Sequence, residues 1–159
     1  MSNIYIIGSL RNPAIPHVAN RLRDEGHVVF DDWHSAGEKA DDAWKEYEGI
    51  RGRRYLEAIQ GYAPTQIFEF DMQHVRAAGI GVLVLPAGRS GHLELGYMIG
   101  RGQAGYILFD GEPERDRWDV MYKLAHGIFF DVDALVKGLA HHLPESAHNE
   151  LPNTDDIPF

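Results

Sequence analysis

The chain has 159 residues, of which 44% are hydrophobic and 25% charged, a balance typical of one folded domain. The absence of cysteine excludes disulfide scaffolds, thiolate zinc sites, iron–sulfur clusters and cysteine nucleophiles. The formal charge of -9 disfavours binding to duplex DNA. No run reaches the roughly 18 apolar residues of a membrane span, and the N-terminus does not look like a secretory signal. We therefore expect a soluble, cytoplasmic protein that binds a small ligand.

Short apolar segments alternate with amphipathic ones along residues 1–142. The apolar segments predict strands at Asn3–Gly8, His27–Asp31, Ile80–Leu85, Gly105–Phe109 and Gly127–Phe130. The amphipathic segments predict helices at Ile15–Glu25, Asp41–Gln60, Met72–Ala78, Leu93–Arg101, Asp116–Leu124 and Val132–His141, the last capped by Asp131. This alternation predicts an α/β domain, a doubly wound parallel sheet of about five strands with helices on both faces. Ligands of such sheets bind beyond the carboxyl ends of the strands.

The first predicted strand ends in a loop with features of a phosphate or sugar site. Gly8, Ser9 and Arg11 follow the strand in the segment IYIIGSLRNP, and arginine is a strong partner for phosphate. The segment lacks the GxGxxG and GxxxxGK[ST] patterns, so the sequence does not support binding of NAD or ATP. A simple turn is the alternative interpretation.

A glycine-rich loop follows the third predicted strand in LPAGRSGHLELGYMIG, residues 85–100. Gly88 and Gly91 allow a tight turn, and the amides from Ser90 onward would open a helix and attract an anion. Glu94 then falls in the first helical turn, where the helix dipole is expected to lower its pKa. An ionised, fixed carboxylate is suited to act as a nucleophile, although a residue that merely complements the dipole would occupy the same position.

Four short motifs resemble one enzyme family along most of residues 3–140. The family is the nucleoside 2-deoxyribosyltransferases together with their nucleotide N-hydrolase relatives. Its opening motif is [I/V]Y-x-x-G-[S/P], its N-hydrolase branch continues with G-S-[I/L]-R, an aspartate precedes its central strand, and its signature is E-[L/I/A]-G-[Y/F/R]. These motifs are matched here by Ile4, Tyr5, Gly8 and Ser9, by Gly8–Arg11, by Asp71, and by Glu94, Leu95, Gly96 and Tyr97.

The resemblance implies cleavage of the N-glycosidic bond of a nucleoside or nucleotide, without a metal or other cofactor. Glu94 would attack the anomeric carbon and form a covalent glycosyl-enzyme intermediate. Asp71 would help to protonate the leaving base or orient the sugar, and Tyr5 would hold the Glu94 carboxylate. The alternative interpretations are that Asp71 is the N-cap of a helix at 72–78 and that Tyr5 is a packing residue.

Within the family, the sequence favours the hydrolases that act on nucleoside 5′-monophosphates. Ser9, Arg11 and Ser90 favour them because they offer donors to a phosphate. One position departs from the pattern, since the hydrolases carry a phosphate-contacting serine six residues before the glutamate, where this chain has Gly88. A deoxyribosyltransferase and a non-catalytic nucleotide-binding or docking protein stay as alternatives. The PGGxGTxxE motif of phosphoribohydrolases that release cytokinin bases is not matched.

The base pocket is expected in the loop after the second strand, FDDWHSAG, residues 30–37. Trp33 would stack on the base, while Asp32 and His34 would hydrogen-bond to it, with Phe68 and Phe70 nearby. Structural roles for these residues are the alternative, and the choice between purine and pyrimidine stays open. The nine histidines show no metal-ligand spacing, so we assign no metal.

Members of this family form dimers or larger oligomers in which a partner subunit closes the site. The segment WDVMYKL matches the stretch that partners contribute and places Asp119 and Met121 in that role. The alternative is that Trp118, Met121 and Leu124 form the apolar face of a core helix.

Residues 143–159 are acidic, contain no lysine or arginine, and lack any helical or alternating period, so we expect a flexible tail. Its end, DDIPF, resembles the acidic tip of bacterial single-stranded-DNA-binding proteins. The resemblance implies docking onto host replication and repair proteins, as a phage-encoded enzyme might do, and a merely solubilising tail is the alternative. The residues concerned are Asp155, Asp156, Ile157, Pro158 and Phe159.

Overall fold

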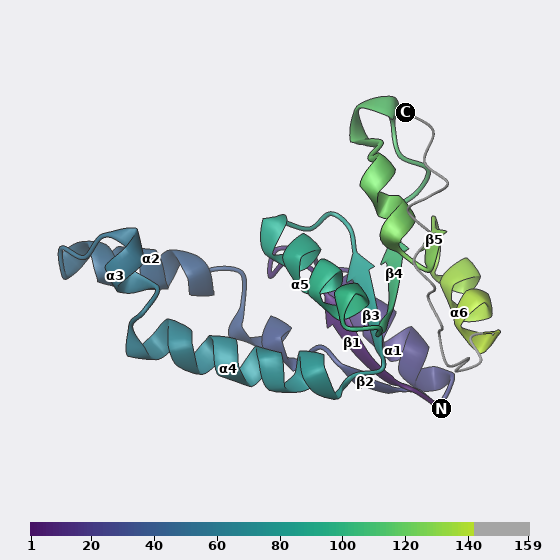
Figure 1. Cartoon of the computed structure of the whole chain (residues 1–159), viewed down its shortest axis with the longest axis horizontal. Helices are drawn as coiled ribbons and strands as arrows, with labels where there is room; N and C mark the ends of the chain where they lie inside the picture. Colours follow the sequence, from purple (N-terminus) through teal and green to yellow (C-terminus); the bar gives the residue numbers. More distant parts are fainter. Residues whose placement is uncertain (142–159) are drawn as a thin grey trace, which may run out of the picture.

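The computed structural model describes residues 1–141 and contains one five-stranded parallel sheet (Figure 1). The strands lie in the order β2-β1-β3-β4-β5, and their bounds are β1 Asn3–Ile7, β2 Val28–Phe30, β3 Ile80–Val84, β4 Ala104–Leu108 and β5 Gly127–Phe129. The predicted doubly wound α/β fold is confirmed. The predicted tail at 143–159, with its DDIPF end, lies outside the described residues.

Helices cover both faces of the sheet because its central strands are apolar on both sides. Helices α1 (Ile15–Asp24) and α6 (Val132–Ala140) bury their apolar faces against one side of the sheet, and α4 (Tyr62–Ala77) and α5 (Arg89–Gly100) cover the other. Successive residues of a strand point to opposite faces. Accordingly, Ile4 and Ile6 of β1 join the first core cluster, whereas Tyr5 joins the second beneath α4 and α5.

The last helix begins as the sequence predicts. Asp131 is the N-cap of α6, and its side chain accepts a hydrogen bond from the Ala134 amide at 2.7 Å. This contact satisfies one of the amide groups that the first turn of a helix leaves without a partner.

Four predicted helices differ from the structure, among them the one predicted at Leu93–Arg101, which begins at Arg89. The segment predicted as one helix at Asp41–Gln60 forms α2 (Ala40–Ile50) and the short α3 (Tyr55–Ala58), with Gly52 between them at a φ of +67°. That left-handed conformation interrupts the helix and favours glycine. Helix α4 begins at Tyr62, whereas the sequence predicted a start at Met72. The prediction missed the first half of the helix because exposed apolar residues there obscure the helical period.

The segment predicted as a helix at Asp116–Leu124 forms two short 3-10 turns, η2 (Arg115–Arg117) and η3 (Val120–Leu124). The interpretation of Trp118, Met121 and Leu124 as a core face is wrong, because 64%, 62% and 57% of their surfaces are exposed. These residues form an exposed apolar surface beyond the fourth strand, on which the Arg115 guanidinium lies over the Trp118 ring at 5.8 Å.

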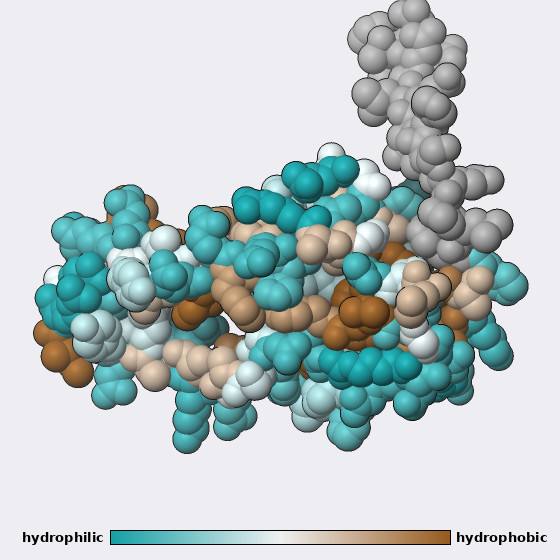
Figure 2. All heavy atoms as spheres, turned by 90° about the horizontal axis from the view of Figure 1, so that it is seen from below, coloured by the Kyte–Doolittle hydropathy of each residue, from teal (hydrophilic) through white to brown (hydrophobic). Residues whose placement is uncertain are grey.

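Helices α2 and α3 and residues 62–70 of α4 project away from the sheet, and we call them the arm (Figure 1). A buried ion pair stabilises its bend, since Arg53 donates to both carboxylate oxygens of Glu48, at 2.6 and 2.8 Å. Figure 2 shows apolar residues on the arm surface among polar ones. The large exposed side chains there are Tyr47, Ile50, Tyr55, Leu56, Ile59, Tyr62, Ile67, Phe68 and Phe70.

Across residues 1–141, every helix is too short or too polar to cross a lipid bilayer.

Candidate active site

The candidate site lies where the order of the strands reverses. After β1 the chain adds β2 on one side and then crosses over to place β3 on the other. At such a switch point the loops leave the sheet in opposite directions and open a crevice at the carboxyl ends of the strands. The loops after β1 and β3, which carry most of the predicted site residues, therefore lie side by side.

Asn12 ties these two loops together. It is only 5% exposed, and its side-chain amide donates to the carbonyls of Val84 and Pro86 at 3.5 and 3.4 Å. Its side-chain oxygen accepts from the Ala14 amide at 3.0 Å. The sequence does not single out Asn12 within the IYIIGSLRNP segment, because nothing in the local pattern indicates partners more than 70 residues away.

Tyr5, Asp71 and Glu94 meet at the switch point from three different elements. Tyr5 stands on β1 and faces α4 and α5, Asp71 lies inside α4, and Glu94 lies in the second turn of α5. The Tyr5 hydroxyl donates to the Glu94 carboxylate, and Asp71 is close enough for its charge to act on both other groups. The structure thus places together the three residues that the sequence motifs singled out as catalytic.

The environment of Glu94 raises its pKa from 4.5 to about 7. Burial is the main cause, the negative charge of Asp71 adds to it, and the hydrogen bond from Tyr5 opposes it. The predicted lowering by the helix dipole is wrong. Helix α5 begins at Arg89 rather than Leu93, so Glu94 lies beyond the first turn, to which the dipole effect is largely confined.

The other two groups are also shifted toward their protonated forms. Burial raises the pKa of Asp71, and the neighbouring His74 opposes this rise. Burial together with the charges of Glu94 and Asp71 raises the pKa of Tyr5 above its usual range. The interpretation of Asp71 as an N-cap is wrong, because α4 begins at Tyr62. At neutral pH the site can therefore hold one carboxylate and one carboxylic acid side by side.

A stack of rings forms one wall beside Asp71. Phe30, at the end of β2, has Tyr5 on one side at 5.6 Å between ring centroids and the His74 ring stacked on it at 3.7 Å. Phe70 leans against both Phe30 and His74. His74 Nδ1 donates to the Phe70 carbonyl at 2.8 Å, since a carbonyl can only accept. Sequence reasoning missed His74, although its spacing of three residues from Asp71 would place both on one side of a helix.

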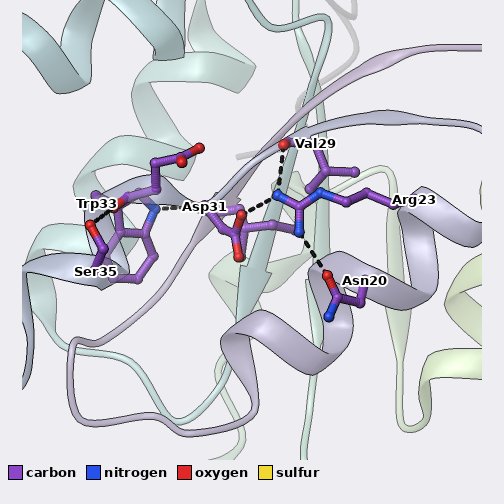
Figure 3. A network of polar contacts seen from close by, with 8 residues as sticks. Asn20, Arg23, Val29, Asp31, Trp33 and Ser35 are labelled. Atoms are coloured by element: carbon purple, nitrogen blue, oxygen red, sulfur yellow. Dashed lines mark hydrogen bonds and ion pairs between the residues drawn. The ribbon is translucent and has the colours of Figure 1, made fainter.

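The residues predicted to bind the base support the loop after β2, in which Asp32–Ala36 forms the 3-10 turn η1. The Trp33 indole donates to the Ile6 carbonyl at 2.8 Å, and His34 Nε2 lies 3.0 Å from the Asn12 carbonyl. Asp32 is exposed, and its carbonyl accepts from Ser35. Just before this turn, Asp31 pairs with Arg23, whose guanidinium also reaches the Val29 carbonyl (Figure 3).

The predicted phosphate residues form two neighbouring groups. In the first, the loop after β1, Ser9 Oγ accepts from the Arg11 amide at 3.1 Å, which leaves its O–H free to donate. In the second, Gly88 is the N-cap of α5, and Ser90 and Gly91 lie in its first turn, where amides have no helical partner. An open pocket of about 580 Å³ beside this turn is lined by Ala87, Gly88, Arg89, His92 and Leu93.

Gly8 and Gly91 lie where α1 and α5 pack closely against the sheet. A Cβ atom at Gly8 would lie 2.5 Å from Ile15, and one at Gly91 would lie 3.1 Å from Leu83 and 3.2 Å from Ile7. The glycines therefore let α1 and α5 approach the sheet closely, which brings the first turn of α5 next to the carboxyl end of β1.

The predicted partner-contributed residues lie on the surface. The Asp119 side chain accepts from the Met121 amide at 2.8 Å and begins η3, and Met121 is exposed. Within residues 1–141 we find no group of three His, Asp or Glu side chains arranged to hold a metal ion.

Comparison with solved structures places this fold beside three others. A 2-deoxyribosyltransferase from Bacillus psychrosaccharolyticus is 19% identical, with a TM-score of 0.57. The match covers 85% of this chain and 90% of the chain of that enzyme. A conserved protein from Enterococcus faecalis V583 is 14% identical with a TM-score of 0.60, covering 90% and 99%. The Clostridium botulinum CMP N-glycosidase BcmB is 12% identical with a TM-score of 0.53, covering 87% and 98%.

No family model and no curated protein matches the sequence. At these identities the likeness to solved structures establishes the fold, the α/β fold that the alternation of apolar and amphipathic segments predicted.

The raised pKa of Glu94 predicts a pH-dependent cost in stability. The group holds its proton more tightly in the folded chain, with a pKa of about 7, than in the unfolded chain, near 4.5. Its stabilising effect is thus complete below about pH 4.5 and lost as the pH rises through 7. Glu94→Gln should be more stable than the original chain at pH 8, by about 2 kcal/mol, and this advantage should shrink toward pH 4.

Thermal unfolding of both chains from pH 4 to pH 8 measures the effect. Glu46→Gln is the control, because Glu46 is exposed and its substitution should give a difference that hardly changes with pH. A Glu94→Gln difference that is equally flat would show that Glu94 is not held in its neutral form.

Proposed function

We propose that this protein cleaves the N-glycosidic bond of a nucleoside 5′-monophosphate and releases the free base and the sugar phosphate. The observation that carries the proposal is the convergence of Tyr5, Asp71 and Glu94 at the switch point. The fold shared with a 2-deoxyribosyltransferase and a CMP N-glycosidase supports it. Both of those enzymes act on the bond between a base and its sugar.

In the first step, a Glu94 carboxylate oxygen bonds to the anomeric carbon as the bond to the base nitrogen breaks. The electron pair of that bond leaves with the base, which must gain a proton. In the resting pair the proton lies mainly on Glu94, whose pKa is raised partly by the charge of Asp71, so the reactive form is the one in which this proton has passed to Asp71, which then supplies it to the base. The Tyr5 hydrogen bond holds the Glu94 carboxylate in place and favours its ionised form. The product is a glycosyl ester of Glu94.

In the second step, water attacks the anomeric carbon of that ester and displaces Glu94 as a carboxylate. Asp71, which lost its proton in the first step, takes the proton of the water. Both steps occur at the same carbon from opposite faces, so the sugar phosphate forms with retention of configuration. The two carboxyl groups return to their starting protonation states, one ionised and one protonated.

The phosphate is expected to bind between the two groups of residues at the carboxyl edge. Arg11 supplies a permanent positive charge, the Ser9 hydroxyl supplies a donor, and the free amides at the start of α5, near Ser90, supply further donors. These groups lie on loops that Asn12 joins directly. A nucleoside without a phosphate would leave most of them without a ligand.

A deoxyribosyltransferase is the second candidate. The Arg11 guanidinium pairs with Asp42 of α2 at 2.6 Å, and a neutralised arginine suits an uncharged nucleoside. In a transferase, a second base rather than water would resolve the glycosyl ester. An assay that includes a second free base distinguishes the two enzymes, because transfer yields a new nucleoside and hydrolysis yields the free sugar.

A second copy of the chain is the expected partner of the exposed apolar surface around η3. Trp118, Val120, Met121 and Leu124 are all more than half exposed, and such a cluster on a protein surface marks an interaction site. We propose that the partner covers it and brings Asp119 and Met121 to the neighbouring active site. Docking through the terminal DDIPF segment stays a prediction.

Removal of the nucleophile tests the mechanism. Glu94→Ala and Glu94→Gln should reduce base release by several orders of magnitude, because both remove the carboxylate that forms the glycosyl ester. Chromatography of products from a panel of nucleosides and nucleoside monophosphates, with and without a second base, measures this. Glu46→Gln is the control and should keep its activity. Substantial turnover by both Glu94 variants would rule out the covalent mechanism.

Replacement of Arg11 tests the phosphate assignment. Arg11→Ala should raise KM for a 5′-monophosphate by about tenfold or more, because a charge-assisted contact is lost. KM for the matching nucleoside should change little. Steady-state kinetics on the two substrates gives both values. An equal effect on both would place Arg11 outside the phosphate site.

Introduction of a charge tests the dimer. Met121→Glu should shift the chain toward the monomer in sedimentation velocity, because a buried interface does not tolerate an unpaired carboxylate. Lys123→Gln in the same 3-10 turn is the control, because it makes the net charge more negative by the same one unit. If the two variants sediment alike, Met121 does not lie in the interface.

A further inference from the structure

The side chain of Arg11 does not project freely from its loop. Its guanidinium is paired with the carboxylate of Asp42, with Nη2 and Oδ2 2.6 Å apart. Asp42 lies in the first turn of α2, on the arm, whereas Arg11 lies on the loop after β1. The charge that the proposed function assigns to the substrate phosphate is thus occupied by an anion of the protein itself.

Lys45 completes a small charged cluster around Asp42. Its ammonium group lies 3.4 Å from the second carboxylate oxygen, so one carboxylate lies between two cations. These two partners lower the pKa of Asp42, mainly through the hydrogen bond from Arg11, which keeps it ionised at neutral pH. A phosphate dianion carries the two negative charges that would balance Arg11 and Lys45 together.

The Arg11–Asp42 ion pair is exposed, so another anion can replace Asp42 as the partner of Arg11. The Arg11 and Asp42 side chains are 60% and 54% exposed, and exposed ion pairs contribute little to stability because water solvates the separated charges well. Within residues 1–141, the Arg11–Asp42 pair joins α2 to the body by a hydrogen bond and an ionic interaction. Gly37 before α2 and Gly52 after it adopt positive φ angles of 85° and 67°, which gives the helix glycine-containing connections at both ends.

We propose that Asp42 is a specificity-determining residue that occupies the phosphate subsite in the free protein, so that a substrate must displace it from Arg11 to bind. This inference rests on the proposed function, since it takes Arg11 as the phosphate ligand. A 5′-phosphate competes well with one carboxylate because it offers a higher charge and three acceptor oxygens. Smaller or singly charged anions, such as acetate, do not have this advantage.

The displacement also joins binding to the position of the arm. When the phosphate takes Arg11, the link between α2 and the loop after β1 is replaced by a link through the substrate, to Arg11 on one side and Lys45 on the other. In the complex, the position of the arm then depends on the bound phosphate instead of on the Arg11–Asp42 pair. Asp42 therefore sets how strongly the enzyme prefers a phosphorylated sugar over the same sugar without its phosphate.

Neutralisation of Asp42 tests this role, with its neighbour Asp41 as a matched control. Both are acidic residues of the first turn of α2, so Asp42→Asn and Asp41→Asn remove the same charge from the same helix end. Isothermal titration calorimetry with ribose 5-phosphate and with ribose measures the affinity without relying on turnover. Asp42→Asn should bind ribose 5-phosphate about fivefold more tightly than the original chain. Ribose binding should not change, and Asp41→Asn should differ by less than about twofold.

The double variant Arg11→Ala, Asp42→Asn completes the cycle. It should bind ribose 5-phosphate within about twofold of Arg11→Ala and much more weakly than Asp42→Asn, because most of the effect of Asp42 acts through Arg11. If Arg11→Ala weakens binding but Asp42→Asn matches Asp41→Asn or binds more weakly than the original chain, the proposal is overturned while the proposed function stands. If Arg11→Ala leaves ribose 5-phosphate binding unchanged, the assignment of Arg11 to the phosphate fails first.

Discussion

The pairing of β1 with β3 at the centre of the parallel sheet is the constraint on which the rest of the structure depends. These strands are separated by the whole of β2 and the arm along the chain, yet Ile4 pairs with Ile80 and Ile7 with Leu83. The pairing places Tyr5 of β1 under the helix that follows β3, which carries Glu94. It also lets Asn12 donate to the carbonyls of Val84 and Pro86, which joins the loops after β1 and β3.

That arrangement places two carboxyl groups where their ionisation is unfavourable. Glu94 and Asp71 lie close together in a partly buried environment, and both hold their protons more tightly than in water. A folded protein is stable by a small margin, so the apolar contacts of the two core clusters must offset the cost. In return, two carboxyl groups of similar chemistry can take different protonation states, as glycosidic bond cleavage requires.

The arm differs from the body in how it is held. The body has two continuous apolar cores on either side of the sheet, whereas the arm depends on its own bend, stabilised by the Glu48–Arg53 ion pair. The arm carries many exposed apolar side chains. Its Asp42 forms an ion pair with Arg11 of the body. The arm, which has few contacts with the two cores, thus also contacts the candidate phosphate ligand through the Arg11–Asp42 pair.

The five strands and the doubly wound fold could be predicted from the sequence, because strands buried on both faces form unbroken apolar runs such as IGVLV at 80–84. Short motifs also singled out Tyr5, Asp71 and Glu94 before their positions were known. The start of α4 was not visible, because the exposed Tyr62, Ile67 and Phe68 obscure the helical period.

Four features of the site could be seen only in the three-dimensional fold. They are the direction in which the pKa of Glu94 shifts, the partners of Asn12, the stacking of His74 on Phe30 and the pairing of Arg11 with Asp42. Each depends on groups that are far apart in the chain, or on burial by several elements at once. Local propensity and spacing describe neighbours in sequence, whereas desolvation and Coulomb interactions depend on neighbours in space.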